Sequence, residues 1–135
     1  MAPTPHGFVR VLVVEDYPVA RKLYAGELAA SGFLVDQAGD VEEALEVAHL
    51  RAPDVVLLDL ELHGVSGLEF ARILRADASL RMAVIIALSG HSQPEYIRWA
   101  REAGCDFYLV KPCQTEKLVA TIDELLGVAR TAAAG

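Results

Sequence analysis

The chain alternates between short apolar runs and longer segments in which apolar residues recur at helical spacing. Three of the runs are nearly continuous in Val, Ile and Leu, which is typical of parallel strands covered on both faces. Short, β-branched runs of this kind favour strands over helices. The expected strands are 11–15, 33–38, 55–60, 83–89 and 107–111.

An amphipathic segment follows each expected strand. The residues that favour helix ends agree with this pattern: Pro18 and Pro94 suit first turns, Asp40 precedes the second helix, and Gly32 and Gly104 suit helix C-termini. The apolar stripes of the five expected helices lie within 20–28, 41–48, 70–74, 96–103 and 118–126.

Strands that alternate with helices predict an α/β fold with a parallel sheet and right-handed crossovers. For five such units we expect a doubly wound, flavodoxin-like sheet with strand order 2-1-3-4-5 and helices on both faces. Its ligand crevice would lie at the carboxyl ends of strands 1 and 3. We expect one domain over residues 9–127, with short tails at 1–8 and 128–135.

Composition excludes several other classes of protein. With 135 residues and 53% hydrophobic residues the chain is long and apolar enough for a packed core, yet no run approaches the roughly 20 residues of a membrane span. The opening "MAPTPHGFVR" lacks an apolar signal region, so we expect a cytoplasmic protein. The net charge of -7 and scattered basic residues disfavour direct nucleic-acid binding. Cys105 and Cys113 lack metal or disulfide spacing and receive no role.

Three acids lie where the crevice is expected. Glu15 and Asp16 end the first strand and Asp59 ends the third, so their carboxylates should crowd one mouth of the sheet. Like charges this close raise one another's pKa or bind a cation, and Mg²⁺ prefers such oxygen ligands. In the alternative interpretation, Asp16 merely caps the helix that begins near Pro18.

The ends of strands 4 and 5 add a hydroxyl and a cation at the same edge. Ser89 ends "IIALS" and Lys111 ends "FYLVK", and Pro112 follows at once, which makes the Lys111–Pro112 bond a candidate cis peptide. A carboxylate nucleophile, a metal, a lysine and a hydroxyl are the groups that phosphoryl transfer to an aspartate needs. Asp59 is the expected nucleophile, and Lys111 should hold its carboxylate.

Together these segments resemble the CheY-like receiver domain of bacterial response regulators, over nearly all of 10–126. The resemblance is carried by the acids of "VLVVEDYP", the Asp and Gly67 of "DVVLLDLELHGVSG", the Ser of "ALSG", the Lys-Pro of "AREAGCDFYLVKP" and the leucine-rich last helix. It implies a two-component phosphorelay protein whose Asp59 accepts a phosphoryl group from a phosphohistidine. The donor would be a sensor histidine kinase or a histidine phosphotransfer protein.

The resemblance also implies roles for individual residues. Mg²⁺, with Mn²⁺ as a substitute, would be held by Glu15, Asp16, Asp59 and the backbone carbonyl of Glu61. Ser89 would bond a phosphoryl oxygen and Tyr108 would be the switch aromatic, although a half-buried strand tyrosine is the alternative. The readout face would be helix 4, strand 5 and helix 5, in a monomer or weak dimer that controls a further protein. Ile97 and Trp99 fall on helix 4, and packing of Trp99 at the edge of the core is the alternative to a place on this face.

Some residues depart from the family pattern, and other classes of protein share parts of it. His63 stands where the family usually has Pro, Gly90 where Ala is commonest, and Cys113 where a larger apolar residue follows Lys-Pro. "DLELHG" also resembles the nucleophile loop of Asp-x-Asp phosphatases, but there the Asp usually follows the first strand. A flavodoxin-like FMN carrier needs a Ser/Thr/Gly-rich phosphate loop where this chain has "EDYPVAR". A receiver-like module that takes no phosphate is disfavoured by the complete set of site residues.

Overall fold

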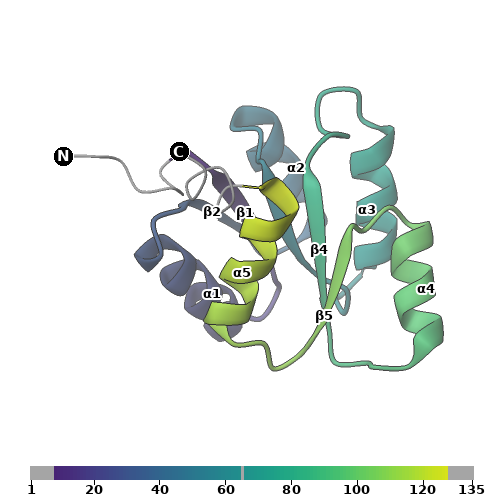
Figure 1. The fold of residues 1–135 in the computed structure, drawn as a ribbon. Coiled ribbons are helices and arrows are strands. Elements are labelled where there is room, and N and C mark those ends of the chain that lie inside the picture. The colour runs from purple at the N-terminus through teal and green to yellow at the C-terminus, as the bar shows by residue number, and fades with distance from the viewer. Residues whose placement is uncertain (1–7, 65, 128–135) are drawn as a thin grey trace.

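Parallel strands and helices alternate along the part of the chain that the structure describes, residues 8–64 and 66–127 of a computed structural model (Figure 1). Every strand end lies within one residue of the sequence-based expectation. The strands are β1 (Arg10–Val14), β2 (Leu34–Ala38), β3 (Val55–Asp59), β4 (Val84–Ser89) and β5 (Phe107–Val110). The helices are α1 (Pro18–Ala30), α2 (Val41–Leu50), α3 (Gly67–Ala76), α4 (Pro94–Glu102) and α5 (Thr115–Leu126).

The strand order is β2-β1-β3-β4-β5, and every pairing is parallel, so the doubly wound sheet is confirmed. Its register brings the carboxyl ends of β1, β3, β4 and β5 to one edge. Val14 pairs with Leu58, Asp59 with Leu88, and Ser89 with Val110. The residues that follow these strands are therefore neighbours in space. The expected terminal tails lie almost wholly outside the described residues.

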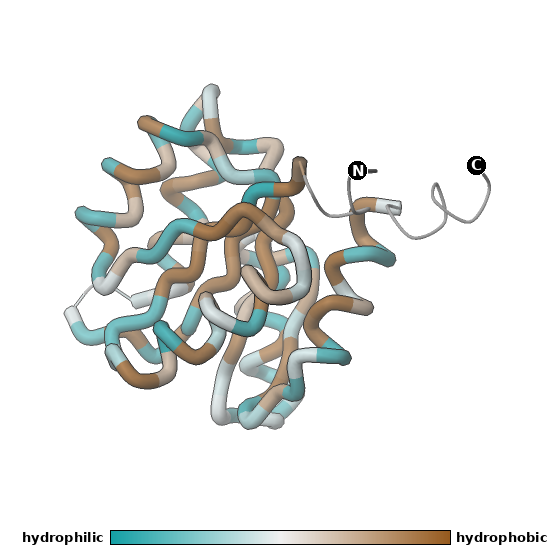
Figure 2. The backbone as a smooth tube through the Cα atoms, turned by 90° about the vertical axis from the view of Figure 1, so that its left-hand side faces the viewer, coloured by the Kyte–Doolittle hydropathy of each residue, from teal (hydrophilic) through white to brown (hydrophobic). Residues whose placement is uncertain are grey.

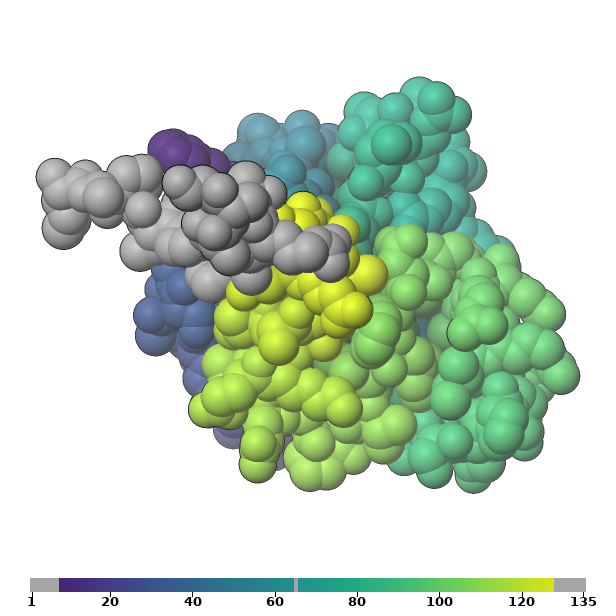
Figure 3. Space-filling view, viewed as in Figure 1, coloured from purple at the N-terminus to yellow at the C-terminus, as the bar shows by residue number. Residues whose placement is uncertain are grey.

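Two apolar layers cover the sheet, one on each face. Alternate residues of the strands pack against α2, α3 and α4 on one face and against α1 and α5 on the other. Figure 2 shows the resulting hydrophobic strands through the centre of the molecule, while the helices alternate hydrophilic and hydrophobic residues. In Figure 3, α5 lies in front of the sheet beside the surface of α4 and β5. This double covering explains why the central strands are almost continuously apolar.

The helix ends agree with the sequence, except at Asp16. Asp40 caps α2 by accepting a hydrogen bond from the Glu43 amide, and Gly32 and Gly104 have the positive φ values that glycine favours after a helix. The N-cap of α1 is Tyr17, which makes no side-chain capping bond. The capping interpretation of Asp16 is therefore wrong, because its carboxylate accepts a hydrogen bond from the His63 amide instead.

Candidate functional site

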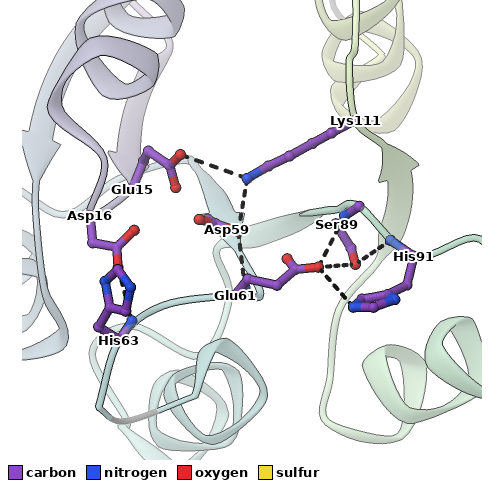
Figure 4. A network of polar contacts seen from close by, with 9 residues as sticks. Glu15, Asp16, Asp59, Glu61, His63, Ser89, His91 and Lys111 are labelled. Carbon is purple, nitrogen blue, oxygen red and sulfur yellow. Dashed lines mark hydrogen bonds and ion pairs between the residues drawn. The ribbon is translucent and has the colours of Figure 1, made fainter.

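The carboxylates of Glu15, Asp16 and Asp59 meet at the carboxyl edge of the sheet (Figure 4). One oxygen of each lies within 4.8 Å of the others. Glu15 and Asp59 are each only 4% exposed, since they directly follow or end strands that are covered on both faces. The crowding that the sequence predicts at this edge is therefore present, and two of the three acids are buried.

Lys111 reaches into the same mouth from the end of β5. Its Nζ lies 3.0 Å from Asp59 Oδ1 and 3.6 Å from Glu15 Oε1. The peptide bond between Lys111 and Pro112, a candidate cis peptide in the sequence, is cis in the structure. The ammonium group thus offsets part of the negative charge that the fold concentrates between β1 and β3.

The pKa values at the mouth follow from burial and from these neighbours. Burial, a hydrogen bond with Asp59 and the charge of Asp59 together raise the pKa of Glu15 to about 8. Burial would also raise the pKa of Asp59, but hydrogen bonds from Glu15, from the Glu61 amide and from Lys111 hold it below its usual value. Burial opposes the charge of Lys111, yet its hydrogen bond and ion pair with Asp59 raise its pKa. Asp59 is therefore the more acidic member of the carboxyl pair.

The donor set fits a hard divalent cation. Glu15 Oε2 is buried and has no hydrogen-bond partner among the described residues. A cation would bind the cluster through carboxylate oxygens, which are the ligands that Mg²⁺ prefers. Glu15, Asp16 and Asp59 are thus the residues that could hold such an ion.

Ser89 ends β4 and is 1% exposed. It lies on the side of Asp59 opposite to Glu15 (Figure 4). Its hydroxyl donates a 2.7 Å hydrogen bond to Glu61 Oε1, and the Gly90 amide donates to the same oxygen over 3.0 Å. Glu61 also donates its own amide to Asp59 Oδ1 over 2.9 Å. The segment that follows β3 therefore bridges Asp59 and the end of β4 (Figure 4).

Tyr108 contacts the loop between β4 and α4 through its phenol. Its hydroxyl donates a 2.6 Å hydrogen bond to the backbone carbonyl of His91, and the side chain is half-buried. The His91 ring stacks on Tyr96, with ring centroids 4.2 Å apart, and Tyr96 meets Trp99 edge to face. A continuous row of rings therefore leads from the site to the exposed surface of α4.

The turn from β3 into α3 depends on Gly67. A Cβ atom at this position would lie 2.6 Å from the Leu60 Cα and 2.7 Å from the Asp59 carbonyl oxygen. Ser66 caps α3 by accepting a hydrogen bond from the Glu69 amide. Glycine thus lets the first turn of α3 approach the backbone that carries Asp59.

Two contacts of the site were not predicted from the sequence. The resemblance implies a metal-binding role for the Glu61 carbonyl and gives its carboxylate no hydrogen-bond partner, whereas that carboxylate receives the hydrogen bonds from β4 and the loop after it. His63, which had no role, bonds Asp16 through both its amide and its ring. Both contacts depend on the path of the loop after β3, and no local pattern encodes that path.

Fold and site together define a flavodoxin-like α/β protein whose crevice at the strand-order switch carries carboxylates and a lysine. Comparison with known families narrows this class, since residues 11–123 match the model of the response regulator receiver domain. The chain belongs to the response regulator receiver family, CheY-like in fold.

Relatives agree over nearly the whole chain. The polar-differentiation response regulator DivK of Brucella anthropi is 34% identical over 117 residues, which cover 87% of this chain and 95% of that protein. The chemotaxis protein CheY4 of Vibrio cholerae superposes with a TM-score of 0.82 at 28% identity, over 86% of this chain and 97% of that one. A response regulator of Burkholderia pseudomallei, solved with a phosphorylated aspartic acid and a calcium ion, has a TM-score of 0.76 at 30% identity, over 83% and 65%.

Membership in the receiver family also indicates the kind of partner and the class of protein. Receiver domains interact with histidine kinases and are typically signalling switches rather than enzymes. None of the helices in the described part of the chain is long and apolar enough to cross a membrane.

Proposed function

We propose that this chain is a phosphoacceptor switch in which Asp59 takes a phosphoryl group from the phosphohistidine of a histidine kinase or phosphotransfer protein. The observation that carries the proposal is the position of the Asp59 carboxylate, which is buried and 3.0 Å from the Lys111 ammonium. The solved relative with a phosphorylated aspartic acid shows that a receiver of this fold carries such a group.

The transfer step is a displacement at phosphorus. An oxygen of Asp59 forms the new P–O bond while the P–N bond to the donor imidazole breaks, and the imidazole leaves with the bonding electrons. Lys111 holds the carboxylate and then neutralises a phosphoryl oxygen, while Ser89 donates its hydroxyl to another. When bound between Glu15, Asp16, Asp59 and the Glu61 carbonyl, Mg²⁺ would supply further neutralisation of the phosphoryl oxygens.

The signal would leave through the β4–α4 loop. Phosphoryl contacts to Ser89 favour one arrangement of that loop, and Tyr108, bonded to it at His91, responds. Phe107, Val110 and Trp99 are exposed apolar residues on β5 and α4, and with α5 they form the surface that a downstream partner would contact.

Incubation with acetyl phosphate and Mg²⁺ tests the proposal directly. We expect intact-protein mass spectrometry to show the mass of one added phosphoryl group, and none when EDTA removes the metal. An unchanged mass in both samples would overturn the proposal. Steady release of phosphate from an unrelated phosphoester would instead favour the phosphatase interpretation.

Metal binding should stabilise the fold more at pH 8 than at pH 5. The pKa of Glu15 is about 8 in the folded protein and about 4.5 when exposed, so folding binds a proton more tightly. The free energy of unfolding without metal therefore falls as pH rises between these values. Because Mg²⁺ competes with that proton, we expect a larger rise of the melting temperature on adding Mg²⁺ at the higher pH.

Glu15→Gln is the matched control for this measurement, since its neutral amide has no proton to lose. The increase caused by Mg²⁺ should be smaller in this variant and nearly equal at the two pH values. An equal increase at pH 5 and pH 8 in the unmodified protein would contradict the assignment of Glu15.

A further inference from the structure

The carboxylate of Glu61 contacts the end of β4 and the loop that follows it. Its Oε1 accepts hydrogen bonds from the Ser89 hydroxyl at 2.7 Å and the Gly90 amide at 3.0 Å, and His91 Nε2 lies 3.6 Å away. All three groups belong to the end of β4 and the loop that follows it, and the Ser89 hydroxyl and the Gly90 amide are the two donors. A single carboxylate oxygen therefore gathers this segment toward Asp59 (Figure 4).

The loop is also closed by contacts of its own. The His91 amide donates to Ser89 Oγ over 3.1 Å, and Tyr108 donates to the His91 carbonyl over 2.6 Å. The His91 ring lies parallel to Tyr96 at an angle of 6°. Ser89, Gly90 and His91 are thus held inward by contacts between groups of the protein alone.

We propose that the Glu61 carboxylate is a built-in substitute for a phosphoryl oxygen, which holds the β4–α4 loop closed before phosphorylation and gives way when the phosphoryl group arrives. The inference rests on the proposed function, because it assigns Ser89 as a phosphoryl ligand. It makes Glu61 a positioning residue for the switch.

The chemistry of the two acceptors supports this substitution. A carboxylate oxygen and a phosphoryl oxygen are both anionic acceptors, and each forms charge-assisted hydrogen bonds with a hydroxyl and an amide. Because Ser89 has a single hydroxyl proton, it can donate to only one of them at a time. Phosphorylation therefore exchanges one anion for another at Ser89.

Space for the displaced side chain is present beside the loop. A cavity of about 210 Å³ borders Glu61, and its walls include Leu60, Ser66, Leu68 and Trp99. The Glu61 side chain is 38% exposed, so it can leave Ser89 and reach water without unfolding α3. The loop closure thus depends on a contact that can be released.

Two consequences follow from the population of the closed loop. Without Glu61 the unphosphorylated loop loses the acceptor for two of its donors and opens more often. With Glu61 the loop is already closed. Phosphorylation should therefore change the amide exchange of the loop less than in a variant without the carboxylate.

Amide hydrogen exchange of the unphosphorylated protein tests the first consequence. In Glu61→Ala we expect the Gly90 and His91 amides to exchange roughly tenfold faster, as the loss of a charge-assisted hydrogen bond implies. Emission of Trp99, the single tryptophan, should shift as His91 leaves Tyr96. Glu69→Ala is the control, because it removes the same charge from an exposed position of α3.

Exchange rates in Glu61→Ala that match those of the unmodified protein would overturn the inference. So would equal acceleration in Glu69→Ala, since the effect would then be one of charge alone. This comparison uses no phosphoryl group, so its outcome is separate from that of the proposed phosphorylation.

Phosphorylation of Glu61→Ala with acetyl phosphate and Mg²⁺ tests the second consequence. The phosphoryl group should restore slow exchange at Gly90 and His91, whereas the unmodified protein should change by a smaller factor. A merely structural role for Glu61 would not be rescued in this way, and a phosphorylated variant that still exchanges fast would contradict the substitution. If neither protein takes up a phosphoryl group, the proposed function fails and the inference, which rests on it, fails with it.

Discussion

Asp59→Asn should abolish phosphoryl uptake from acetyl phosphate while leaving the protein folded. The amide keeps the size of the side chain but has no anionic oxygen to attack phosphorus. It also removes the negative charge that lies 3.0 Å from Lys111 and that helps to raise the pKa of Glu15. We expect the label in the variant to fall below detection under conditions that fully label the unmodified protein.

The free energy of unfolding is the control measurement for Asp59→Asn. Glu15 ionises more readily once Asp59 is neutral and remains 3.6 Å from Lys111, so the lysine keeps a partner. We therefore expect urea titration to place the free energy of unfolding within about 1 kcal/mol of the unmodified protein. Residual labelling of a folded Asp59→Asn protein would show that another residue accepts the group.

Gly67→Ala should lower the free energy of unfolding by about 2–4 kcal/mol. Its Cβ would meet the Leu60 Cα at 2.6 Å and the Asp59 carbonyl oxygen at 2.7 Å, and neither is the end of a flexible side chain. Relief requires α3 to move away from β3, which would also displace Asp59. We expect reduced phosphoryl uptake together with the loss of stability.

Gly26→Ala is the matched control on another helix. This exposed glycine lies within α1, and a Cβ atom there meets nothing within 4 Å. Alanine should raise the free energy of unfolding by about 0.5–1 kcal/mol, because it restricts the unfolded chain and favours helix. The role of Gly67 would be contradicted if urea titrations found both variants less stable than the unmodified protein, or both more stable.

The strands and the residues at their ends were predictable because two strong signals agree. Nearly continuous apolar runs such as 55–58 mark strands that are buried on both faces, and the strand order of such a fold then brings Asp59 beside Glu15. The same order predicts the approach of Lys111 and Ser89. No loop conformation is needed for any of these inferences.

Other features depend on tertiary contacts that no short pattern contains. Asp36 in the edge strand β2 pairs with Arg10 at 2.9 Å and with Arg51 at 2.9 Å, so a charged side chain is accommodated in a strand. Glu61 meets Ser89 across 28 positions of sequence, and this depends on how the chain turns between β3 and α3. The interpretation of Asp16 as a helix cap failed for the same reason, since its partner His63 is 47 residues away.

Peptide mapping after phosphorylation locates the phosphoryl group that Asp59 is proposed to accept. The protein is treated with acetyl phosphate and Mg²⁺, digested, and analysed by tandem mass spectrometry under conditions that preserve acyl phosphates. We predict a single phosphoryl group on the peptide that contains Asp59, and at that residue. A phosphoryl group at any other residue, or none on the folded protein, would contradict the account.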